Sequence, residues 1–104
     1  MHWYIYPAYF FGGALLTNAI PHLVNGVSGR AFQTPFAKPS GKGLSSSTVN
    51  VLWGFFNLAI AWLLIFEVGT FHLRNVEDAF VLGAGMLMMF IISARVFGPL
   101  HGGQ

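Results

Sequence analysis

The sequence predicts an all-α membrane protein with three transmembrane helices, and three observations lead to that prediction. Of the 104 residues, 55% are hydrophobic and only 8% are charged, whereas soluble domains average about 25% charged residues. The apolar residues fall into three long runs, each able to cross about 30 Å of hydrocarbon as a helix. The runs are continuous, which excludes a β-barrel, because barrel strands alternate apolar and polar side chains.

The first expected span covers residues 3–24. About 22 helical residues reach about 33 Å, which is sufficient to cross the bilayer core. Its beginning is rich in aromatic side chains, which gather where a membrane meets water: Trp3, Tyr4, Tyr6 and Tyr9.

The second expected span covers residues 49–68 and the third covers residues 79–97. A run of hydroxyl residues precedes the second span and Asn75 precedes the third, and both are good helix N-caps. We expect Gly98 and Pro99 to end the third helix, because this pair cannot easily continue one. The three spans and their connectors are predicted to form one membrane domain over residues 1–104.

The distribution of positive charge predicts an orientation. The connector at residues 25–48 contains Arg30, Lys38 and Lys42 and no acidic residue, whereas the second connector contains one basic residue. Lys and Arg favour the cytoplasmic side, so we expect this connector and the C-terminus inside and the N-terminus outside. These three cations are candidates for contact with anionic lipid headgroups. We expect the connector to pack on the cytoplasmic face, and whether it is re-entrant stays open.

Polar side chains gather on the cytoplasmic half of the expected spans. Residues at i, i+4 and i+7 share one face of a helix. The first span carries Asn18, His22 and Asn25 at that spacing, the second carries Asn50 and Asn57 with Gly54 between them, and Arg95 reaches the same level from the third.

Two interpretations of these polar side chains stay open. Asparagines often bond neighbouring helices together inside membranes, so the stripes could serve helix packing alone. Ionisable groups inside a membrane frequently mark a functional site, so the stripes could also line a pocket for a headgroup, a quinone ring or a small solute. Arg95 could extend to lipid phosphates, or it could face inward and bind an anionic ligand beside His22.

Several other classes of site are not expected. Glu67, Glu77 and Asp78 all map to the outer side, so no acid is available for general acid–base work within a span. The four histidines are scattered and cysteine is absent, so we expect neither a metal site nor a catalytic residue. A net charge of +2 is too small for nucleic-acid binding.

Two stretches resemble those of small, uncharacterised bacterial membrane proteins. They are "PHLVNGVSGRAFQTPFAKP" and "SSSTVNVLWGFFNL", and the similarity covers residues 18–58. The resemblance implies a multi-pass protein of the bacterial inner membrane. It implies no activity and no binding residue.

The function expected from these observations is non-enzymatic. We expect an accessory or structural subunit of a membrane assembly, with the lipid bilayer and other membrane subunits, or further copies of the chain, as its partners and with no cofactor. The first alternative is an oligomeric small-solute carrier or a lipid- or quinone-binding protein that uses the cytoplasmic-side polar side chains. The second alternative is a haem-binding redox subunit.

Overall fold

A computed structural model describes residues 3–103, and this part of the chain is mostly helical. The elements are α1 (Ile5–Val27), β1 (Phe32–Gln33), β2 (Leu44–Ser45), α2 (Ser47–Trp62), the π-helical turn η1 (Leu63–Glu67) and α3 (Val76–His101). The turn η1 continues α2 without a break, so the two form one rod of 21 residues.

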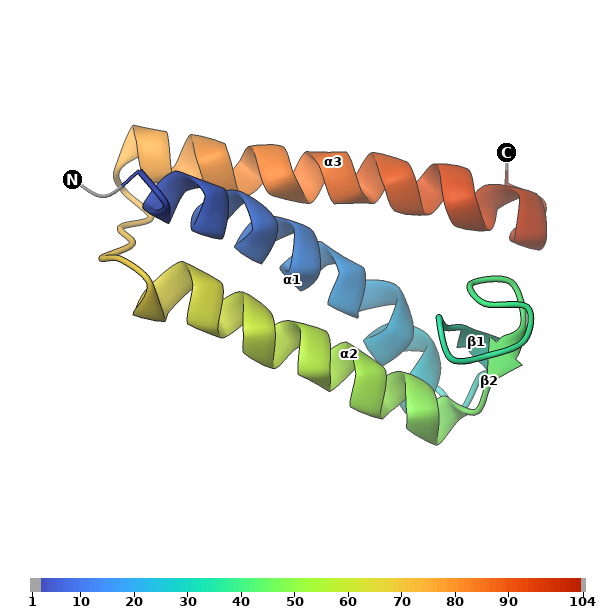
Figure 1. Ribbon diagram of the computed structural model, residues 1–104. Coiled ribbons are helices and arrows are strands. Elements are labelled where there is room, and N and C mark those ends of the chain that lie inside the picture. Colours follow the sequence, from blue (N-terminus) through green and yellow to red (C-terminus); the bar gives the residue numbers. More distant parts are fainter. Residues whose placement is uncertain (1–2, 104) are drawn as a thin grey trace.

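Helix α1 is the central element of the fold. It packs along α2 on one side and along α3 on the other, whereas contacts between α2 and α3 within the described residues are very few. Figure 1 shows α1 close to α3 near the N-terminus and close to α2 near the β1–β2 connector. The C-terminus lies at the connector end and the N-terminus at the opposite end (Figure 1).

Two helices in the described part of the chain are long and apolar enough to cross a membrane. They are α2 with η1, at Ser47–Glu67, and α3, at Val76–His101. Helix α1 has 23 residues and no charged side chain, but its asparagines, prolines and histidine lower its mean hydropathy, and it is not in this set. The prediction of three spans and its orientation therefore stay predictions.

The helix ends follow the predicted caps in two places and depart from the prediction in a third. Ser46 Oγ accepts a hydrogen bond from the Val49 backbone, and Asn75 Oδ1 accepts one from the Asp78 backbone. The expectation that Gly98 and Pro99 end the third helix was wrong, because α3 continues to His101 and ends at Gly102 with φ 76°. Proline removes one hydrogen bond from a helix, and one lost bond so near the end did not stop it.

The first connector is folded onto the helices. Strands β1 and β2 pair antiparallel, with Phe32 opposite Ser45 and Gln33 opposite Leu44. The Phe32 side chain of the connector is buried against the helices. Phe36 is mostly exposed and meets the ring of Trp53 edge to face. The connector therefore packs on the helices at its β1 end, whereas the part around Phe36 is exposed.

Glycines let α1 and α3 approach closely. A Cβ added to Gly85 would overlap the Phe10 backbone, and one added to Gly13 would overlap the Leu82 carbonyl. Gly83, two residues before Gly85, meets open space. The α1–α3 contact thus uses Gly13 and Gly85, and Gly83 stays available on the outer surface.

We expect Gly85→Ala to destabilise the protein by about 1–3 kcal/mol, because the added methyl group must push two helix backbones apart. The matched control is Gly83→Ala, which adds the same methyl group to the same helix in open space. It should be neutral, or stabilising by up to about 1 kcal/mol through helix propensity. Thermal unfolding followed by circular dichroism in mild detergent measures both, and equal effects of the two substitutions would contradict this packing.

Candidate functional site

Asn50 is the hub of a polar cluster beneath the first connector. Its side chain is completely buried. Its Nδ2 lies 3.1, 3.2 and 3.0 Å from the backbone carbonyls of Phe32, Ser45 and Ser46, which share its two N–H donors. Its Oδ1 lies 2.8 Å from His22 Nδ1. One amide group therefore bonds α1, the connector and the start of α2 together.

These contacts determine which nitrogen of His22 carries its proton. Carbonyl oxygens only accept hydrogen bonds, so the atom of Asn50 that faces three of them must be the amide nitrogen. The atom facing His22 is then the amide oxygen, and His22 Nδ1 must donate. His22 is 2% exposed, and a buried imidazolium would need a carboxylate partner. The neutral ring that follows has an acceptor lone pair on Nε2.

Asn18 and Asn57 form a second bridge between α1 and α2, one turn deeper. Asn18 Nδ2 donates to Asn57 Oδ1 at 3.0 Å. Asn57 Nδ2 donates in turn to the Trp53 carbonyl at 2.8 Å, within its own helix. The predicted small and polar stripe of the second span is its packing face, since the buried residues of α2 are Asn50, Gly54, Asn57 and Ala61.

The remaining candidates from the sequence lie outside this cluster. Asn25 Nδ2 donates to the Pro21 carbonyl, and Arg30 Nε donates to Asn25 Oδ1, so this pair secures the end of α1. Lys38 and Lys42 are exposed on the connector. Arg95 is exposed on α3 and is not among the residues that line the cavity beside His22.

The structure adds residues that the sequence argument did not select. Gln33 is buried and its Oε1 lies 2.7 Å from His101 Nε2, while the His101 ring stacks on Phe32 with centroids 5.2 Å apart. His101 therefore belongs to α3 and docks its end onto the connector. Trp53 lies one turn from both Asn50 and Asn57, and that spacing could have identified it; no signal marks Gln33.

A small cavity adjoins His22. Its volume is about 120 Å³, and its lining comes from α1, the connector, α2 and α3. The polar lining groups include Asn18, His22, Gln33 and Thr34, and the aromatic ones are Trp53 and Phe97. Trp53 Nε1 is buried and has no hydrogen-bond partner in the described part of the chain.

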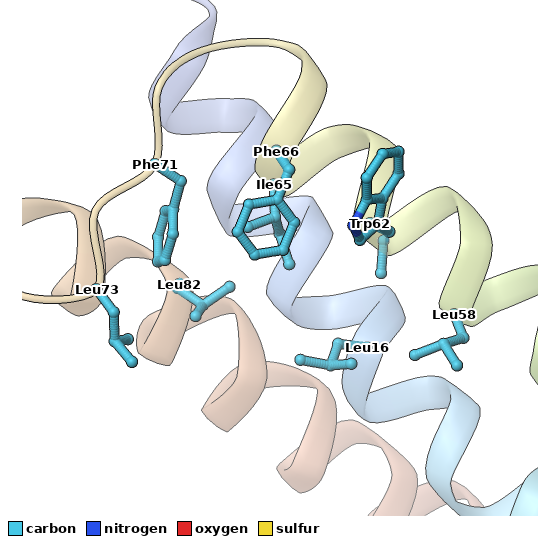
Figure 2. A pocket seen from close by; sticks show the side chains of 9 residues that line it. Leu16, Leu58, Trp62, Ile65, Phe66, Phe71, Leu73 and Leu82 are labelled. Atoms are coloured by element: carbon cyan, nitrogen blue, oxygen red, sulfur yellow. The ribbon is translucent and has the colours of Figure 1, made fainter.

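A second, apolar cavity lies at the opposite end of the bundle. Figure 2 shows side chains from all three helices and the α2–α3 connector around it, among them Leu16, Leu58, Phe66, Phe71 and Leu82. Its volume is about 370 Å³, and no charged side chain lines it. Its chemistry suits hydrocarbon, such as a lipid acyl chain.

Among residues 3–103, no group of three or more His, Asp or Glu side chains is placed to hold a metal ion. Asp78 is buried at the end far from His22, where its carboxylate accepts the His72 backbone N–H at 3.0 Å. The cavity beside His22 offers hydrogen-bond donors and acceptors, and no acidic side chain is among its lining residues.

No family model, curated protein or solved structure matches the chain. The candidate site is therefore defined by its geometry alone.

We expect Asn50→Leu to release the connector from the helices. The substitution keeps the branched shape of the side chain, although Leu is larger, and removes the side-chain hydrogen bonds of Asn50 to His22 and to the connector carbonyls, at about 1–3 kcal/mol for each buried group left without a partner. Limited proteolysis of residues 28–46 in detergent, with thermal unfolding, measures the release.

The control for this substitution is Ser40→Ala, which removes an exposed hydrogen bond to the Pro35 carbonyl in the same connector. Its effect should stay within about 0.5 kcal/mol. Equal protease resistance of Asn50→Leu and the unsubstituted protein would show that Asn50 does not hold the connector.

Proposed function

We propose that the chain is a non-enzymatic accessory or structural subunit of an assembly in the bacterial inner membrane. In this proposal all three helices cross the membrane, with the N-terminus outside and the first connector and C-terminus in the cytoplasm. The largest extent of the Cα positions, 43 Å, suits a bilayer of about 40–45 Å including headgroups. Arg30, Lys38 and Lys42 then lie at the cytoplasmic surface and contact anionic lipid.

The observation that carries the subunit proposal is the exposure of α3. Only 6% of its apolar stretch is buried within the described structure. Its outer surface includes Gly83, four residues after Ala79, with open space around the glycine. Small residues at this spacing let a second membrane helix approach closely. A helix of another subunit is therefore the partner that this surface fits best.

The hydrogen bonding of the polar cluster supports the same proposal. The asparagine side chains in this cluster already form hydrogen bonds within the protein. Asn18 donates to Asn57, and Asn57 donates to a backbone carbonyl. Asn50 bonds to His22 and to backbone carbonyls. A carrier would need polar groups along a pathway through the bundle. The haem alternative needs an axial ligand that faces a cavity large enough for a porphyrin, and the cavity beside His22 has a volume of only about 120 Å³.

Purification from membranes in a mild detergent tests the proposal. We expect a second membrane subunit to copurify in a fixed ratio, and we expect Gly83→Ile to reduce its recovery at least several-fold, because the larger side chain keeps the partner helix away. Ile92→Leu is the control, since it changes an exposed residue on the opposite face of the same helix at constant volume. A strictly monomeric protein that copurifies with no partner would contradict the subunit proposal.

A further inference from the structure

Two groups at the cavity beside His22 define the kind of ligand it can hold. His22 Nε2 is an acceptor, because its Nδ1 donates to Asn50. Trp53 Nε1 is a donor, and it is buried without a partner in the described structure. Buried polar groups normally have hydrogen-bond partners, so the unpartnered indole N–H of Trp53 needs an explanation.

A hydroxyl group has the chemistry that both sites need, because it is a donor and an acceptor in one. It can donate its proton to His22 Nε2 and accept the N–H of Trp53. The ligand must also be neutral, because no charged side chain lines the cavity and a buried unpaired charge is costly.

The size and walls of the cavity favour an aromatic ring. Trp53 and Phe97 both line it, and each meets the His22 ring edge to face with centroids 6.4 Å apart. Aromatic rings prefer such edge-to-face neighbours. The volume of about 120 Å³ is close to the roughly 150 Å³ that accommodates benzene in an engineered protein cavity.

We propose that this cavity binds the hydroxyl-bearing ring of a neutral phenol, the chemical class that includes membrane quinols. His22 accepts the hydroxyl proton, Trp53 donates to the hydroxyl oxygen, and Phe97 packs against the ring. Asn50 is a positioning residue, because it holds the His22 ring in the tautomer that leaves Nε2 as an acceptor. The proposal concerns binding only and does not depend on the partner subunit proposed above.

The test is a ¹⁹F NMR titration of the full chain in detergent micelles. The probes are 4-fluorophenol and 4-fluorotoluene, which match in ring and differ in the hydroxyl group. We expect saturable binding of 4-fluorophenol and only non-saturable partitioning of 4-fluorotoluene. This comparison uses the unsubstituted protein, so it holds even where a variant fails to fold.

Two variants test the assigned partners. Trp53→Phe keeps an aromatic wall and removes the N–H, and His22→Asn keeps a donor toward Asn50 and removes the Nε2 acceptor. Each should weaken 4-fluorophenol binding about fivefold to tenfold, as expected for the loss of one hydrogen bond. Trp3→Phe, an exposed position that lines neither cavity, is the matched control and should bind as the unsubstituted protein does.

Equal, non-saturable behaviour of the two probes would overturn the proposal. Saturable binding that Trp53→Phe and His22→Asn leave unchanged would also overturn it, because the phenol would then be bound elsewhere.

Discussion

The contact between Asn50 and His22 is the constraint on which the connector end of the structure depends. A buried asparagine needs partners for both ends of its amide, and Asn50 finds them in three different segments. The same contact orients the His22 imidazole and brings β1 against the helices. The cavity beside His22 exists because the connector is held there.

The packing of α1 between two apolar helices explains how α1 can carry polar residues. Helix α1 lies between α2 and α3, and nine of its 23 residues are buried. Its exposed large side chains include the apolar Phe11, Ile20 and Val24, whereas Asn18 bonds to Asn57 of α2. A helix that is shielded on two sides does not need the hydropathy of one that faces lipid. The lower hydropathy of α1 is thus compatible with a position inside the membrane.

The sequence predicted the helices well because long apolar runs and their caps are local signals. Ser46 and Asn75 cap helices as their positions indicated, and the i, i+4, i+7 spacing identified the buried face of α2. The extension of α3 past Pro99 was not predictable in this way, because His101 docks on a connector distant in sequence. The cavity beside His22 could not be predicted from the sequence either, because it depends on how Phe32 and its neighbours fold back onto α1.

The side of the membrane on which residue 3 lies tests the central claim, which is that a polar α1 crosses the membrane inside the bundle. The chain has no cysteine, so single cysteines at Trp3, Ser40 and Thr70, all exposed, report position when spheroplasts are treated with a membrane-impermeant maleimide. We expect labelling of Trp3→Cys and Thr70→Cys in intact spheroplasts and labelling of Ser40→Cys only after permeabilisation. Identical behaviour of Trp3→Cys and Ser40→Cys would place both ends of α1 on one side and contradict the claim.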